Sequence, residues 1–149
     1  MVIIFKPFWV SFPDFVTVTG AKPVFVETLD EKQNEPDFKD LESKINKNTK
    51  GIIINSPSNP TGGVWSDDAI LRLLDLVKNR SDIWIFSDEC YEQLTYDTPF
   101  KSIATFNPEA KNIITFQSCS KTYAMTGWRI GYLAGDEKLV KAISKLQGQ

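Results

Sequence analysis

Six short apolar runs recur along the chain, and polar or turn residues bound each of them. Their residues are mostly β-branched or aromatic and nearly continuous, which is typical of strands buried on both faces, as in a mostly parallel sheet. The pattern therefore predicts a sheet of about six strands. The runs are residues 2–5, 24–26, 52–54, 83–86, 113–116 and 130–134.

Amphipathic segments lie between several of these runs. Ser66 is suited to cap the amino end of a helix that continues to Val77, because two acidic residues, Asp67 and Asp68, would occupy its first turn. Residues 37–47 and 136–146 also have helical periodicity, and a less regular segment, 11–19, ends at Gly20. We expect residues 95–108 to form a loop with one helical turn near Ile103.

Strands that alternate with helices predict right-handed crossovers and a doubly wound α/β sheet. The last two runs are joined by residues 118–128 alone, a connection barely long enough for a parallel crossover. We therefore expect residues 130–134 to run antiparallel to their neighbour. No internal repeat, low-complexity tract or interdomain linker interrupts this pattern.

Composition narrows the class of protein. The chain has 149 residues, 42% of them apolar and 24% charged, which is typical of one globular domain. A net charge of -2 makes a nucleic-acid partner a poor prediction, and no apolar run approaches the roughly 20 residues that span a membrane. The two cysteines, Cys90 and Cys119, do not suggest a disulfide framework. Their low number is typical of proteins in the reducing cytoplasm, which is the location that we expect. The absence of histidine excludes Ser-His-Asp triads and most zinc sites, and we predict no metal site.

Polar and aromatic candidates follow the carboxyl ends of the predicted strands, which is where open α/β sheets bind ligands. This shared position is the reason to treat them as one site. Trp9 follows the first run, Asn59 the third, Asp88 and Tyr91 the fourth, and Ser118 and Lys121 the fifth.

These residue types suit a pyridine aldehyde cofactor. Lys121 could form a Schiff base with the aldehyde and afterwards carry a proton, and Asp88 could pair with the pyridinium nitrogen. Tyr91 and Asn59 could donate hydrogen bonds to a ring phenolate. Taken singly, each has a simpler structural interpretation: a surface lysine, a turn aspartate, a half-buried tyrosine and a turn asparagine.

Three further residues fit the rest of such a ligand. Trp9 could stack on the ring, although aromatic side chains more often serve only packing. Ser118 and Arg129 could hold a phosphate, Arg129 through a bidentate pair, although an isolated arginine is usually a surface charge.

Four motifs carry a resemblance to a known family. They are Pro7-Phe8-Trp9, Asn59-Pro60-Thr61-Gly62, Asp88-Glu89-Cys90-Tyr91, and Ser118-Cys119-Ser120-Lys121 followed by Gly127-Trp128-Arg129. Over essentially all 149 residues the chain resembles class I aminotransferases of the aspartate aminotransferase type, which are fold-type I pyridoxal-phosphate enzymes. The sequences of its motifs are most similar to those of the bacterial-type branch.

The resemblance implies a role for each candidate residue. Lys121 would be the Schiff-base lysine of pyridoxal 5'-phosphate, and Asp88 would pair with the ring nitrogen. Asn59 and Tyr91 would contact the ring hydroxyl oxygen. The phosphate would lie against Ser118 and Arg129, with Trp9 stacked near the ring.

The resemblance also implies small-molecule substrates, an amino acid (aspartate by analogy) and a 2-oxo acid, and a homo-oligomer, a dimer with shared active sites. The family's proteins are more than twice this length. We therefore expect residues 1–149 to be the central part of the cofactor-binding large domain, without the first strand and phosphate loop or the carboxyl-terminal small domain. We expect such a chain to be inactive by itself, and to associate through its exposed sheet edge.

Two alternatives remain open at this point. Lys121, Asp88 and Tyr91 would serve a β-eliminating lyase of the same fold equally well. A non-catalytic remnant, an α/β domain that associates with itself or with a partner, would need none of this chemistry.

Overall fold

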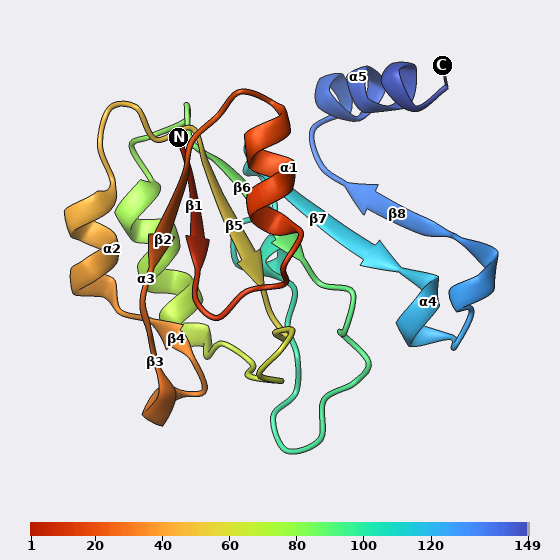
Figure 1. The fold of residues 1–149 in the computed structure, drawn as a ribbon, viewed down its shortest axis with the longest axis horizontal. Helices are drawn as coiled ribbons and strands as arrows, with labels where there is room; N and C mark the ends of the chain where they lie inside the picture. Colours follow the sequence, from red (N-terminus) through yellow and green to blue (C-terminus); the bar gives the residue numbers. More distant parts are fainter. Residues whose placement is uncertain (149) are drawn as a thin grey trace.

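The computed structural model describes residues 1–148. A six-stranded sheet has the order β2-β1-β5-β6-β7-β8, parallel except that β8 pairs antiparallel with β7 (Figure 1). The predicted α/β fold, with its antiparallel last strand, is confirmed. The strands are β1 Val2–Phe5, β2 Pro23–Val26, β5 Gly51–Asn55, β6 Trp84–Asp88, β7 Ile113–Ser118 and β8 Gly131–Ala134.

Helices occupy the predicted segments, and side-chain caps explain where α2, α3 and α5 begin. Ser66 Oγ accepts the backbone N–H of Ala69, and the carboxylates of Asp37 and Asp136 accept the first N–H groups of their helices. Gly20 follows the first helix at φ 78°. The helices are α1 Phe12–Val18, α2 Phe38–Lys44, α3 Asp67–Val77, α4 Cys119–Thr122 and α5 Glu137–Gln147.

Some short elements were not predicted. The strands β3 (Thr28–Leu29) and β4 (Glu35–Pro36) form a two-stranded antiparallel hairpin. In the connection from β7 to β8 lie α4 and the 3-10 turn η3 (Thr126–Trp128). The helix expected over residues 37–47 ends at Lys44, because Asn46 N–H turns to Thr49 Oγ1 at 3.0 Å. The turn expected near Ile103 is the 3-10 helix η2 (Ile103–Phe106).

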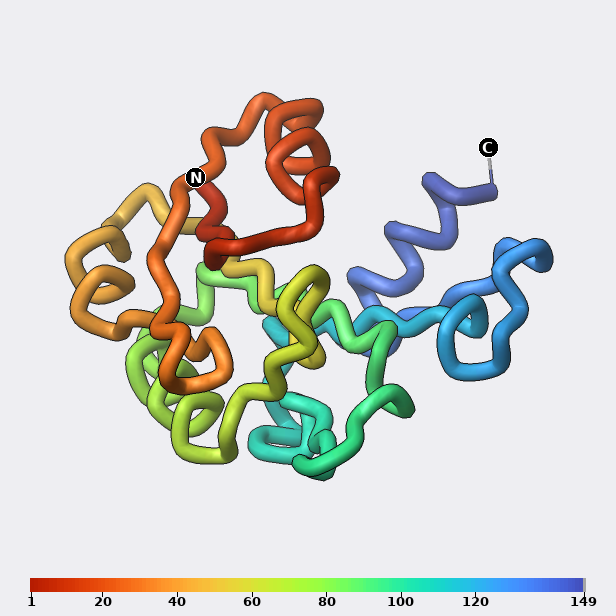
Figure 2. The backbone as a smooth tube through the Cα atoms, turned by 60° about the horizontal axis from the view of Figure 1, so that its bottom comes forward, coloured from red at the N-terminus to blue at the C-terminus, as the bar shows by residue number. Residues whose placement is uncertain are grey.

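Helices cover both faces of the sheet, so the core has two parts. On one face α2 and α3 pack against the larger cluster, which includes Ile3, Phe5 and Leu73. On the other, α1 packs Phe12 and Val16 against Ile4 (Figure 1). Neighbouring residues of β1 thus point to opposite faces, as the pleat of a strand requires. Both views place α4, β8 and α5 at the end of the sheet away from β2 (Figure 1 and Figure 2).

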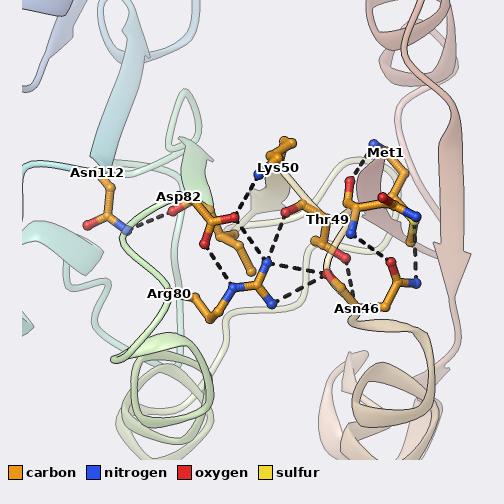
Figure 3. Close-up of polar contacts among 9 residues, drawn as sticks. Met1, Asn46, Thr49, Lys50, Arg80, Asp82 and Asn112 are labelled. Atoms are coloured by element: carbon orange, nitrogen blue, oxygen red, sulfur yellow. Dashed lines mark hydrogen bonds and ion pairs between the residues drawn. The ribbon is translucent and has the colours of Figure 1, made fainter.

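A polar network lies at the amino ends of the strands, and we call Asn46, Thr49, Lys50, Arg80 and Asp82 the amino-edge network (Figure 3). Arg80 Nε and Lys50 Nζ donate to the Asp82 carboxylate at 2.8 and 2.7 Å, and these bonds hold the pKa of Asp82 well below its usual value. Arg80 also reaches the carbonyl oxygen of Asn46 at 3.3 Å. The network therefore links the residues just before β5 to those just before β6.

No helix among residues 1–148 has the length and apolar character needed to cross a bilayer. Within the same residues no group of three or more His, Cys, Asp or Glu side chains is arranged to hold a metal ion. Cys90 and Cys119 are both unpaired thiols.

Candidate active site

The register of the parallel strands aligns three residues at the carboxyl edge of the sheet. Asn55 of β5 pairs with Asp88 of β6, and Asp88 pairs with Phe116 of β7. Asn55 Nδ2 also donates to the carbonyl oxygen of Asp88 at 3.1 Å. The three strand ends therefore form one continuous floor, although the chain separates each from the next by a crossover.

A cavity of about 750 Å³ opens over this floor, beside α1. Phe86 and Phe116 contribute apolar side chains from the sheet, and Phe12, Phe15 and Val16 contribute them from α1. The structure brings all seven residues proposed from the sequence to the wall of this one cavity. They are Trp9, Asn59, Asp88, Tyr91, Ser118, Lys121 and Arg129.

Asp88 is the last residue of β6, and its carboxylate is largely removed from water. Burial raises the pKa of this carboxyl, while the backbone N–H of Cys90, which donates to Asp88 Oδ1 at 3.2 Å, acts in the opposite direction. Burial, and then the Asp88 charge, raise the pKa of the Cys90 thiol to about 12. Cys90 is therefore a neutral thiol at physiological pH.

Asn59 and Tyr91 are hydrogen-bonded to each other at the cavity wall. Asn59 Nδ2 donates to Tyr91 Oη at 3.4 Å, although the two residues come from loops after different strands. The backbone N–H of Asn59 donates to Asn55 Oδ1 at 2.7 Å, which anchors its loop to the end of β5. The amide and the hydroxyl together present one polar point on the cavity wall.

Lys121 lies in α4, directly after β7. Ser118 begins this short helix, since its Oγ accepts the backbone N–H of Ser120 at 3.2 Å. The Lys121 side chain is exposed, and its Nζ lies 5.6 Å from the centroid of the Tyr91 ring. The ammonium group therefore lies over the ring of Tyr91, whose hydroxyl contacts Asn59. The negative face of an aromatic ring attracts a cation in this position.

Arg129 and Trp9 lie at the rim. Arg129 has a left-handed backbone, with φ 55°, and its exposed guanidinium donates to the carbonyl oxygen of Thr126 at 2.9 Å. Trp9 is 39% exposed and packs edge-on against Phe12 and Phe15, with ring centroids 5.6 and 5.7 Å away. The indole is thus held by α1 while one part of it remains open to the cavity.

Sequence reasoning missed several residues of the cavity wall. Asn55, Cys90, Gln117, Ser120 and Thr126 line it beside the predicted side chains. Asn55 could have been found, because it is the polar residue that ends a buried run. The sequence carries no comparable signal for Thr126, which reaches the cavity only through the fold of η3.

A doubly wound α/β sheet with its cavity at the carboxyl edge defines a ligand-binding member of the α/β class. Within that class the whole chain, residues 1–149, matches the family described as aminotransferase class I and II, and the chain belongs to this family. Members of the family are transferases that depend on pyridoxal phosphate.

Individual relatives agree with this assignment. The chain is 43% identical to an aspartate aminotransferase from Bacillus subtilis over 97% of its length. It is 41% identical, over 99% of its length, to a protein from Aquifex aeolicus named "Probable aspartate/prephenate aminotransferase". It covers 37% and 38% of these two proteins, so it spans little more than a third of their length.

Solved structures have the same fold. An aspartate aminotransferase from Thermus thermophilus, solved with maleate, is 37% identical with a TM-score of 0.90, covering 97% of this chain and 37% of that one. An aromatic aminotransferase from Pyrococcus horikoshii is 36% identical with a TM-score of 0.92, covering 98% of this chain and 39% of that one.

Proposed function

We propose that this chain carries the cofactor-binding part of a pyridoxal-phosphate-dependent aminotransferase, which moves an amino group from an amino acid to a 2-oxo acid. The observation that supports this most is the convergence of Lys121, Asp88 and Tyr91, from two different strand ends, on one cavity. Membership of the family agrees with it. Because the chain spans little more than a third of its relatives, the activity is a property proposed for the whole protein.

The residues that line the cavity fit the cofactor chemically. The amine of Lys121 can bond covalently to an aldehyde carbon, and the buried carboxylate of Asp88 can accept a hydrogen bond from a protonated pyridine nitrogen. The Asn59 amide and the Tyr91 hydroxyl, already hydrogen-bonded to each other, can both turn donors toward a ring oxygen. A cavity of about 750 Å³ has room for such a ring and a small substrate.

The phosphate and the ring faces have matching residues as well. Ser118 and Arg129 stand on the side of the cavity that carries Lys121, where a hydroxyl and a guanidinium suit a phosphate dianion. Trp9, which packs against Phe12 and Phe15 of α1, supplies an aromatic ring to the same cavity.

When bound, the cofactor supplies an electron-accepting ring that stabilises negative charge on the substrate Cα. Once the amino group of the substrate has displaced Lys121 from the aldehyde carbon, the freed amine would take the proton from the substrate Cα and deliver it to the cofactor, and its side chain is exposed enough to move between the two. Asp88 must stay ionised to hold a proton on the ring nitrogen. The Cys90 backbone N–H favours that ionised form against the effect of burial.

Aspartate is the amino donor that we propose, because curated relatives at 41 to 43% identity are named for aspartate. Maleate, bound in the Thermus thermophilus structure, is a dicarboxylate, as aspartate is. The aromatic aminotransferase from Pyrococcus horikoshii favours a second candidate, an aromatic amino acid. A β-eliminating lyase uses the same three residues and is the alternative reaction.

We place residues 1–149 within the large, cofactor-binding domain and propose that the chain alone does not catalyse the reaction. A homo-oligomer is proposed because apolar and aromatic side chains are exposed around the edge strand β8, among them Trp128, Ile130 and Tyr132. The unpaired thiols suit the reducing cytoplasm, which is the compartment that we propose.

Covalent trapping tests the cofactor assignment. Pyridoxal phosphate is added to the purified 149-residue chain, the adduct is reduced with borohydride, and peptides are analysed by mass spectrometry. We expect label at Lys121, a visible absorption band that Lys121→Ala abolishes, and an unchanged unfolding midpoint, because the Lys121 side chain is exposed. Lys111→Ala, an exposed lysine outside the cavity, is the matched control.

Label spread evenly over the surface lysines, or a band that survives Lys121→Ala, would contradict the assignment. Turnover by the isolated chain comparable with that of complete relatives would contradict the proposed inactivity instead. An adduct at Lys121 that releases ammonia and a 2-oxo acid from the substrate would favour the lyase alternative.

A further inference from the structure

Glu89 lies between two residues of the candidate site, yet its side chain points away from the cavity. It follows Asp88 at the end of β6 and is 0% exposed. Its Oε1 accepts three hydrogen bonds: Ser87 Oγ and Ser102 Oγ donate at 3.0 Å each, and the backbone N–H of Ile103 donates at 3.2 Å. One buried carboxylate oxygen therefore joins the end of β6 to η2.

The second carboxylate oxygen connects Glu89 to the next two strands. Gln117 Nε2, from β7, donates to Glu89 Oε2 at 3.5 Å, and Gln117 Oε1 accepts the hydroxyl of Tyr132 on β8. Gln117 also lines the cavity, directly before Ser118. The backbone adds a further link, since Glu89 N–H donates to the carbonyl oxygen of Phe116 at 2.9 Å.

We propose that Glu89 is a positioning residue, which fixes two walls of the cofactor cavity at once. One wall is the turn after β6, which presents Asp88 and Tyr91, and the other is the end of β7, which presents Ser118. The benefit to cofactor binding rests on the proposed function. The attachment of two walls to one buried carboxylate is a property of the chain with or without cofactor.

Packing alone does not require a carboxylate at this place. Burying one is costly unless hydrogen bonds replace its water, and burial indeed raises the pKa of Glu89 while its four donors act against that rise. An apolar side chain could fill the same space but could not orient the hydroxyls of Ser87 and Ser102 or the amide of Gln117. Four donors from β6, η2 and β7 fix the orientation of this carboxylate, which suits a residue that sets geometry.

The network also predicts which substitution it can absorb. In Glu89→Gln the side-chain oxygen can keep the three donors on Oε1, and the new amide N–H group faces Gln117. Gln117 can then turn its own amide over, and the Tyr132 hydroxyl can rotate to accept instead of donate. In Glu89→Ala no such repair exists, because the Ile103 N–H and the Ser87 hydroxyl are buried and lose their acceptor.

The experiment compares Glu89→Ala and Glu89→Gln with Thr49→Val in the purified chain. Thr49 is a matched control at the opposite edge of the sheet: it is also 0% exposed, and its loss deprives the Asn46 N–H of its acceptor (Figure 3). The first readout is hydrogen–deuterium exchange of the cofactor-free protein over residues 88–92 and 117–121. The second is the affinity for pyridoxal phosphate.

We expect Glu89→Ala to accelerate exchange in both segments by about tenfold or more and to weaken pyridoxal-phosphate binding by a similar factor. Glu89→Gln should stay within about threefold of the unmodified chain in both readouts. Thr49→Val should lower the unfolding midpoint without a selective change in either segment.

Exchange that is equally slow in Glu89→Ala, or equally fast in Thr49→Val, would overturn the positioning role. If the unmodified chain takes up no cofactor at Lys121, the proposed function fails, while the exchange comparison still decides the role of Glu89. Should Glu89→Ala not fold, Gln117→Leu removes the side-chain link from Glu89 to β7, together with the bond from Tyr132, and leaves the three donors to Glu89 Oε1 in place. Faster exchange confined to residues 117–121 then supports the role, and unchanged exchange there overturns it.

Discussion

Gly63→Ala should disturb the loop that carries Asn59, because Gly63 lies against the backbone of the β3–β4 hairpin. A Cβ atom built at Gly63 would stand 2.0 Å from the carbonyl oxygen of Gln33 and 2.9 Å from its carbonyl carbon. Both atoms belong to the backbone, so no flexible side chain can swing aside. The hairpin tip and the Asn59 loop would have to separate.

The size of the effect follows from these distances. Real Cβ contacts are essentially never closer than 3.0 Å, so a movement of about 1 Å is required, and overpacking of this kind costs about 1–3 kcal/mol of the free energy of unfolding. The bond from Asn59 Nδ2 to Tyr91 Oη is already 3.4 Å long and would break. A displaced Asn59 amide would also lose its proposed bond to the ring oxygen of the cofactor, and one neutral hydrogen bond contributes about 1 kcal/mol, or about fivefold in affinity.

Gly62→Ala is the matched control. Gly62 has φ 74°, which disfavours alanine by about 1–2 kcal/mol, but a Cβ atom at this residue would have no other atom within 4 Å. Denaturant unfolding and cofactor titration of both variants separate the backbone strain at residue 62 from the steric clash at residue 63. We expect both variants to be less stable, and Gly63→Ala alone to bind pyridoxal phosphate about fivefold more weakly. A Gly63→Ala chain with unchanged stability and affinity would refute the reasoning, since the close approach to Gln33 would then be absent.

Two further predictions concern Asp88 and the helix caps. Because burial raises the folded-state pKa of Asp88, its contribution to stability is complete below the ordinary value of 3.8 and is lost as the pH rises through the raised value. Asp88→Asn should therefore flatten the fall in stability between pH 3.8 and neutral pH and weaken cofactor binding; unfolding curves across that range with an unchanged slope would contradict this. Ser66→Ala should cost about 1 kcal/mol of unfolding free energy, because its hydroxyl caps α3, whereas Ser11→Ala, whose side chain makes no cap bond, should cost little; equal losses in denaturant titrations would refute the assignment.

Much of the architecture could be read from local patterns. Continuous apolar runs predict strands buried on both faces, and all six are strands of one sheet. The burial expected for the last run is wrong, because β8 lies at the edge of the sheet and is largely exposed. The antiparallel direction of β8 was also expected from the chain, because residues 118–128 are barely enough for a parallel crossover. The β3–β4 hairpin escaped prediction, since strands of two residues have no periodicity to detect. Its tip residues, Gln33 and Asn34, take left-handed backbones that their sequence does not demand.

The sequence by itself determined which chemical groups stand at the strand ends: an amine at Lys121, a carboxylate at Asp88 and a hydroxyl at Tyr91. The tertiary structure alone decided which of them meet, because strand register is set by the packing of the whole sheet. Asn55 lies beside Asp88 only through the pairing of β5 with β6. In the sequence Glu89 is one more acidic residue of a motif, and only its donors from β6, η2 and β7 show that it lies behind the cavity wall. Local propensity acts over a few residues, whereas these contacts join segments that the crossovers bring together.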